Sequence, residues 1–238
     1  MLLFYLRHGD PIYDPDSLTP LGSRQAEALG KRLSLYGVDE IYASTSNRAR
    51  LTARPTCEMM KMEMTLLDWC NEAHAWGELT RTYEDGRRTW CFYDPEIRET
   101  FCREEVRALG RRWYTHPDLA PYGFEKGITR IQRETDAFMA QFGYEHNLEK
   151  NMYFSRGVNT KRVALFAHQG FGLAFLSCLT DVPYPQFSTR FDMGHTGMTV
   201  IHFPEQEGWV IPQILQLSSD SHIYREGLPT CYQNQIRF

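Results

Sequence analysis

Two continuous apolar runs, residues 2–6 and residues 163–167, are the clearest hydrophobic pattern in the chain. Each run is followed within three residues by a histidine and a glycine, and the histidines are His8 and His168. A short apolar run that ends near glycine is typical of a strand buried on both faces, as in a parallel sheet. The two runs therefore predict two buried parallel strands, each leading into a polar loop.

Helical spacing of apolar residues follows the first of these strands. Thr19 is a good N-cap and Pro20 is tolerated at the first helical position, so a helix is predicted from there to Gly37. Elsewhere in the N-terminal and C-terminal parts of the chain, we predict strands at 41–43 and 64–67, a helix starting near 48, a buried helix at 171–179, and closing strands at 198–203 and 209–217. Strands that alternate with helices predict a three-layer α/β/α sandwich with a mainly parallel sheet.

The segment between these two parts, about residues 77–160, has a helical pattern. One helix is predicted from Asp94 through Trp113, closed by Pro117. A second carries apolar residues at helical spacing over 124–142. No linker composition separates the segment from its neighbours, so we expect residues 1–238 to form a single domain with a helical insertion.

Composition and charge exclude several classes of protein. With 26 Lys+Arg against 30 Asp+Glu the formal charge is −4, which argues against binding to nucleic acid or to a membrane surface. The apolar N-terminus is interrupted by Arg7, too early for a signal peptide. The cysteines have neither CxxC nor zinc-finger spacing, so reduced thiols and a cytoplasmic location are expected. They are Cys57, Cys70, Cys91, Cys102, Cys178 and Cys231.

The two histidines are expected to meet, because ligands of parallel α/β sheets bind beyond the carboxyl ends of the strands. Arg7 stands beside His8, and Arg48 begins the helix that follows another predicted strand. His168 precedes a helix whose N-terminal N–H groups favour an anion. Two guanidinium groups and two imidazoles at this edge would form a site for an anion the size of phosphate.

Four motifs, in this order, resemble those of the histidine phosphatase superfamily, which includes cofactor-dependent phosphoglycerate mutases and many phosphomonoesterases. They are Arg7-His8-Gly9, the Leu-Thr-Pro-Leu-Gly of 18–22, Ser44 to Arg48 with the residues that follow, and His168-x-Gly170. The resemblance covers about residues 2–76 and 162–204. It says little about the intervening helical insertion, which we expect to be a cap over the active site.

The resemblance also implies a role for each matching residue. His8 would be the nucleophile that takes the phosphoryl group as phosphohistidine, while Arg7, Arg48 and His168 would hold the phosphate oxygens. The family also supplies an acid that protonates the leaving group. Glu72 is the best positional match for this acid, and Asp68 is the alternative.

Two further residues are candidates for phosphate binding. Ser44 would donate a hydrogen bond to phosphate or else cap the following helix, and His195 would reach the phosphate or else stabilise a turn. A metal site built from His8, Asp10 and His168 is the rival interpretation, but no further ligand spacing supports it. We expect neither a metal nor a cofactor.

These residues together predict a metal-independent phosphomonoester hydrolase that acts through phosphohistidine on a small phosphorylated metabolite. The alternative within the superfamily is phosphoryl transfer of the phosphoglycerate mutase type. The alternative from another class is a binding or scaffold protein on the same fold, which would be expected to lose a catalytic residue. The substrate and the oligomeric state stay open, with a homodimer as one alternative.

Overall fold

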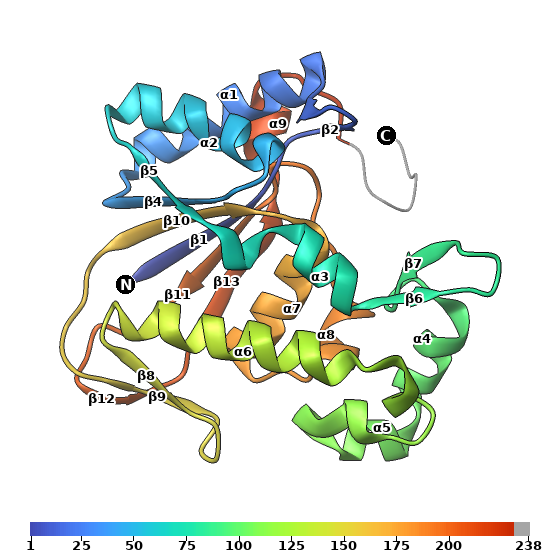
Figure 1. Cartoon of the computed structure of the whole chain (residues 1–238). Coiled ribbons are helices and arrows are strands. Elements are labelled where there is room, and N and C mark those ends of the chain that lie inside the picture. The colour runs from blue at the N-terminus through green and yellow to red at the C-terminus, as the bar shows by residue number, and fades with distance from the viewer. Residues whose placement is uncertain (231–238) are drawn as a thin grey trace.

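A six-stranded sheet forms the centre of the protein in a computed structural model (Figure 1), which describes residues 1–230, so that Cys231 lies outside the described residues. The strands in spatial order are β13 (Gln213–Ser219), β11 (Met198–His202), β1 (Leu2–Arg7), β10 (Arg162–Ala167), β4 (Glu40–Ser44) and β5 (Met64–Leu67). Strands β1, β10, β4 and β5 run parallel, whereas β11 is antiparallel to both β1 and β13. The predicted mainly parallel sheet is confirmed.

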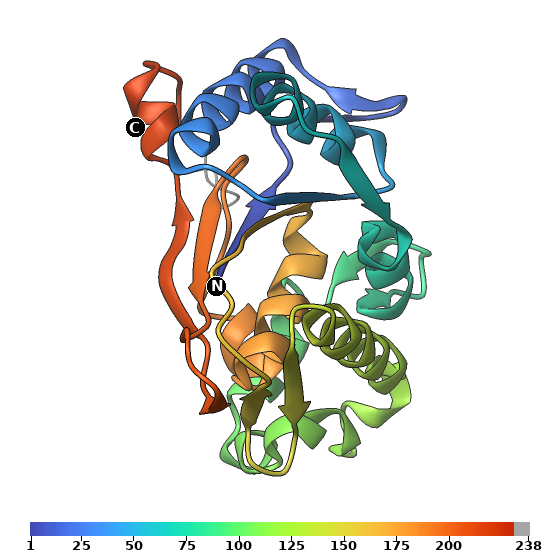
Figure 2. The same ribbon diagram turned by 90° about the vertical axis from the view of Figure 1, so that its left-hand side faces the viewer.

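Both faces of the sheet are covered by helices, which explains why the central strands are continuously apolar (Figure 2). Successive side chains of a strand point to opposite faces. In β1, Leu3 and Tyr5 pack on the side of the helices α6 (Phe124–Ala140) and α7 (Gln169–Thr180). Phe4 and Leu6 pack on the other side, with α1 (Pro20–Tyr36) and α2 (Asn47–Met60). The predicted three-layer sandwich is therefore confirmed. The short helix α9 (Ser221–Arg225) packs against α1.

The segment between residues 77 and 160 differs in detail from its predicted pattern. The long helix predicted from Asp94 to Trp113 is broken into shorter pieces, because Arg103 is extended and Gly110 adopts a positive φ of 54° that ends the regular helix. The pieces are α4 (Pro95–Cys102), α5 (Glu104–Ala108) and the 3-10 helix η2 (Gly110–Thr115), followed by η3 (Ala120–Tyr122).

The same segment also contains strands that the helical pattern did not predict. One pair is β6 (Thr80–Thr82) with β7 (Arg88–Trp90), and the other is β8 (Tyr144–Asn147) with β9 (Met152–Ser155). These strands of three or four residues are too short to show a period in the sequence. The segment nevertheless packs on the sandwich, because Trp113 and Phe124 belong to the same buried cluster as Leu165 of β10.

The predicted closing strand at 209–217 is also wrong in part, because it is two strands. β12 (Gly208–Val210) pairs with β9, and β13 pairs with β11 at the edge of the main sheet. Pro212 lies between them. Proline has no N–H for a strand ladder, so the chain leaves one sheet there and enters the other.

The structure also bears on the membrane spans and on the state of the cysteines. Within residues 1–230, no helix has the length and apolar character needed to cross a membrane. All five cysteines of this part are free thiols, and Cys102 is the exposed one.

Two short helices complete the fold beside the sheet. They are α3 (Glu72–Glu78), which follows the 3-10 helix η1 (Asp68–Cys70), and α8 (Tyr184–Ser188).

A buried histidine joins the segment 77–160 to the sandwich. His146 of β8 lies between two carboxylates, with Nδ1 2.7 Å from Asp136 Oδ1 in α6 and Nε2 2.9 Å from Asp181 Oδ2 after α7. Its ring stacks on Tyr153 at 4.2 Å. Burial lowers the pKa of His146, but the hydrogen bonds to Asp136 and Asp181 outweigh it and raise the pKa to about 9. His146 is therefore a cation at neutral pH.

This ion cluster predicts how stability depends on pH. A histidine whose pKa is raised by folding stabilises the protein fully below its unfolded pKa of about 6.5, and loses that contribution as pH rises through about 9. Urea denaturation should show that the difference in unfolding free energy between wild type and His146→Gln shrinks by about 2–3 kcal/mol over this range. The control is His202→Gln, because His202 has no carboxylate within ion-pair distance in the described chain. A pH-independent His146→Gln difference would contradict the prediction.

Candidate active site

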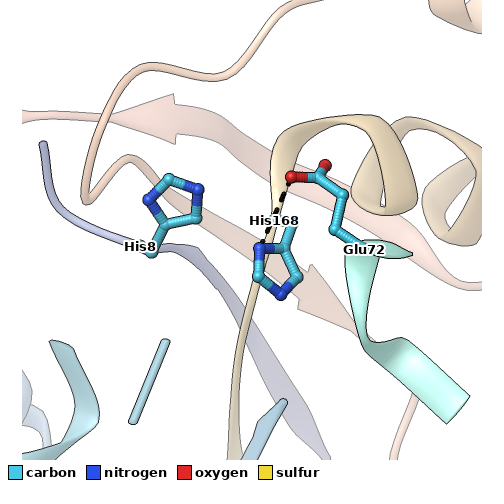
Figure 3. Close-up of side chains that lie close together, drawn as sticks. All are labelled: His8, Glu72 and His168. Carbon is cyan, nitrogen blue, oxygen red and sulfur yellow. Dashed lines mark ion pairs between the residues drawn. The ribbon is translucent and has the colours of Figure 1, made fainter. Parts of the chain in front are cut away.

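The histidines that follow the two apolar runs lie side by side at one edge of the sheet (Figure 3). Strands β1 and β10 are direct parallel neighbours, with Arg7 paired to Ala167, so the next residue of each strand is at the same level. Those residues are His8 and His168, whose ring centroids are 5.3 Å apart. The carboxyl ends of the strands thus bring together residues that are far apart in sequence.

A third histidine reaches the same edge from an antiparallel strand. Because β11 pairs with β1 so that Met198 faces Leu6, β11 begins where β1 ends. The turn before β11 places His195 with its ring centroid 5.9 Å from that of His8. Its Nε2 accepts a hydrogen bond from Arg7 Nη2 at 3.1 Å, because a guanidinium can only donate. Burial, and then the charge of Arg7, lower the pKa of His195 to about 3.

The imidazole of His8 is neutral and held in one tautomer. Burial lowers its pKa well below the ordinary value, and the neighbouring His168 and the positive charge of Arg7 act in the same direction. His8 Nδ1 lies 2.7 Å from the carbonyl oxygen of Gly9, which can only accept a hydrogen bond. The proton is therefore on Nδ1, and Nε2 keeps its lone pair.

His168 is the most enclosed of these groups. Its Nε2 lies 2.9 Å from the Ser44 hydroxyl and 3.2 Å from the Ser46 hydroxyl, and its Nδ1 lies 3.6 Å from Glu72 Oε2 (Figure 3). The backbone carbonyl of His168 accepts a hydrogen bond from the Tyr5 hydroxyl at 2.6 Å. Burial lowers the pKa of His168 well below its ordinary value, and the charges of Arg48 and Arg7 add to this.

Arg48 and Glu72 lie at the starts of the helices α2 and α3. Arg48 Nη2 donates to Glu72 Oε2 at 3.3 Å, and Arg48 Nη1 donates to Asp16 Oδ1 at 2.9 Å. The other oxygen of Glu72 accepts a hydrogen bond from the Gly170 N–H at the start of α7, at 2.8 Å. The carboxyl group thus joins an arginine of one helix to the N-terminus of another, directly beside His168.

The structure separates the two candidate acids. Glu72 lies within the cluster, with its side chain 15% exposed. Asp68 instead faces solvent with its side chain 70% exposed, where it binds the Thr45 hydroxyl and His74 Nε2, each at 2.9 Å. Among the described residues, no hydrogen bond or ion pair joins Asp68 to His8 or His168.

Two further residues support the site in ways that the sequence did not predict, although Thr52 belongs to one of the four motifs. Asp16 Oδ2 accepts a hydrogen bond from the backbone N–H of Asn47 and so caps α2, which leaves Ser44 and Ser46 to face His168. The Thr52 hydroxyl accepts a hydrogen bond from the Gly9 N–H at 3.0 Å and fixes the loop after β1. Each contact spans thirty or more residues, so no local pattern signals it.

One group of side chains has the composition of a metal site. His8, Glu72 and His168 offer ligand atoms within 4.8 Å of one another, whereas Asp10 lies 3.4 Å from His195 Nδ1 instead. The guanidinium groups of Arg7 and Arg48 border the same space. Two adjacent positive charges disfavour a divalent cation and favour an anion. The residues therefore suit a phosphate group better than a metal.

The site contains a neutral imidazole with a free lone pair, two arginines, a second imidazole and a carboxyl group. These are the groups that a phosphoryl-transfer enzyme needs. The chain belongs to the histidine phosphatase superfamily (branch 1), whose family model matches residues 4–138. No curated protein matches this sequence.

Solved structures with the same fold include three phosphatases. Phosphoserine phosphatase from Entamoeba histolytica has 16% identity and a TM-score of 0.59, and the match covers 93% of this chain and 98% of that chain. A mycobacterial glucosyl-3-phosphoglycerate phosphatase has 18% identity and a TM-score of 0.58, with 92% and 98% covered. Alpha-ribazole phosphatase from Shigella flexneri has 18% identity and a TM-score of 0.57, with 92% and 97% covered. These likenesses show the fold alone.

Proposed function

We propose that the protein is a metal-independent phosphomonoester hydrolase that acts through a phosphohistidine on a small phosphorylated metabolite. The observation that carries this proposal is the hydrogen bond from His8 Nδ1 to the Gly9 carbonyl, which leaves Nε2 unprotonated within the cluster that Arg7 and Arg48 border. The structural neighbours are phosphatases named for small phosphate esters, which supports this class of substrate.

In the first step, His8 Nε2 attacks phosphorus and the bond from phosphorus to the ester oxygen breaks. Arg7 and Arg48, with His168 and His195, would hold the phosphate oxygens and neutralise their charge. A bound phosphate dianion would also stabilise a charged imidazole at His168, because it offsets the arginines that now disfavour one.

Glu72 would supply the proton that the leaving alkoxide needs. In the second step, the resulting carboxylate accepts a proton from water, the water oxygen attacks phosphorus, and the bond to Nε2 breaks. His8 and protonated Glu72 are regenerated, and inorganic phosphate is released.

We also propose that the described chain, residues 1–230, forms one domain in which residues 77–160 are an insertion that covers the site. Two contacts support this arrangement. The Trp90 ring of β7 lies so close to Gly170 that a Cβ there would come within 2.4 Å of it. The Tyr93 hydroxyl accepts a hydrogen bond from Gln169 Nε2 at 2.8 Å. The insertion thus borders the start of α7, next to His168.

The decisive experiment for this function is an assay of purified protein with an aryl phosphate and with alkyl phosphate esters. We expect inorganic phosphate to be released at the same rate with and without EDTA, because arginines supply the positive charge. Product analysis distinguishes hydrolysis from transfer. Isomerised ester without free phosphate would indicate a mutase, and loss of activity in EDTA would contradict metal independence. Absence of turnover on every ester would favour a binding protein.

A further inference from the structure

A cavity of about 460 Å³ lies beside the catalytic cluster, between the start of α4 and the loop that follows α8. Aromatic side chains line one part of it, and the charged side chains of Arg98, Arg190 and Asp192 line another. Its volume falls in the range of about 300–1,000 Å³ found for small-molecule sites. It is therefore large enough for the part of a metabolite that lies beyond its phosphate group.

Hydrogen bonds link the wall of this cavity to residues next to the catalytic cluster. Gln169 follows His168 in the chain, and its side-chain amide donates to the Tyr93 hydroxyl and to Asp192 Oδ1 at the wall of the cavity. The next residue after Asp192 is Met193, whose carbonyl accepts a hydrogen bond from Arg7 Nη1 at 2.5 Å. Two residues at the wall of the cavity are thus tied to neighbours of the cluster. Tyr93 and Asp192 bind Gln169, which follows His168 in the chain, and Asp192 precedes Met193, the hydrogen-bond partner of Arg7.

The side chains that line the cavity carry a net positive charge. Arg98 and Arg190 are exposed, and neither forms an ion pair with a carboxylate within residues 1–230. By contrast, Arg81 in the same insertion is paired with both Asp94 and Glu96. Asp192 is the single acidic residue that lines the cavity, and its Oδ1 is already occupied by the Gln169 amide and the Met193 N–H.

We propose that this cavity binds the part of the substrate beyond the phosphate, and that this part carries a second anionic group, a carboxylate or another phosphate. Arg98 and Arg190 would bind that group, since guanidinium groups pair with planar carboxylates and with phosphates through two hydrogen bonds. Tyr93 and Phe191, which are 40% and 44% exposed, would contact the carbon skeleton. This proposal rests on the proposed hydrolase function and narrows its class of substrate.

The test compares kcat/KM for three esters with the same carbon number: glycerol phosphate, its carboxylate analogue phosphoglycerate, and propanediol bisphosphate. Wild type should prefer at least one of the doubly anionic esters over glycerol phosphate by roughly 10- to 100-fold, as expected for charge-assisted hydrogen bonds. A preference for phosphoglycerate would show that the cavity binds a carboxylate, and a preference for propanediol bisphosphate would show that it binds a second phosphate. Arg98→Ala and Arg190→Ala should each reduce that preference about tenfold, and lysine at either position should retain part of it.

Arg107→Ala is the matched control, because Arg107 is an exposed arginine of the same insertion that does not line the cavity. It should keep the wild-type preference. Equal kcat/KM for all three esters in wild type, or a preference unchanged in both alanine variants, would overturn the cavity assignment while leaving the hydrolase function intact. If wild type released phosphate from none of these esters and from no aryl phosphate, the hydrolase function itself would fail, and this proposal with it.

Discussion

Replacing His8 with alanine is expected to abolish both turnover and the phosphorylated form of the enzyme. Without Nε2 there is no atom to take the phosphoryl group, so kcat should fall by about 10⁴-fold or more. Wild type mixed with substrate and denatured in alkali, which preserves bonds between phosphorus and nitrogen, should carry one phosphoryl group by mass spectrometry. Proteolytic mapping should place this group on His8, and His8→Ala should carry none.

The control for this variant is His74→Ala, because His74 lies outside the cluster and binds the exposed Asp68. It should retain wild-type turnover. A thermal denaturation curve for His8→Ala shows whether the protein still folds, since the variant also loses the hydrogen bond to the Gly9 carbonyl. Folded His8→Ala protein with wild-type turnover would rule out His8 as the nucleophile.

The second large effect is expected for Glu72→Gln, with a size that depends on the leaving group. Glutamine can still accept the Gly170 N–H but cannot donate the proton that an alkoxide needs. Hydrolysis of alkyl phosphates should therefore slow by about 10²- to 10⁴-fold. Phosphorylation by an aryl phosphate should slow much less, because a phenolate leaves without a proton. Rapid-quench measurement of the first turnover on both esters provides this comparison.

Asp68→Asn is the matched control, since Asp68 is the alternative acid and lies close by in the sequence. It should retain nearly full activity on both classes of ester, because its carboxylate faces solvent and binds Thr45 and His74. If Asp68→Asn instead lost alkyl ester hydrolysis and Glu72→Gln did not, the acid would be Asp68. An equal loss on aryl and alkyl esters in Glu72→Gln would indicate a structural role for Glu72.

The sandwich could be predicted from the sequence because its strands have a strong local signal. Strands β1 and β10 are buried on both faces and are therefore apolar throughout, and the histidine after each one marks its carboxyl end. The start of α1 was equally clear, since the Thr19 side chain accepts a hydrogen bond from the Gly22 N–H as expected of an N-cap. The segment 77–160 was predicted less well, because its strands are short and its helices are interrupted.

Local sequence patterns are enough to identify the class of fold, the family, and the residues at or after the strand ends: Arg7, His8, Arg48 and His168. These depend on short-range patterns that can be seen within one window of the chain. The pairing of β10 with β1, which puts the two histidines next to each other, becomes known only from the three-dimensional arrangement. The same is true of Glu72, which lies beside His168 where Asp68 does not, and of the cavity that Arg98 and Arg190 share. Such contacts depend on how distant elements pack, and no local pattern of polar and apolar residues specifies that packing.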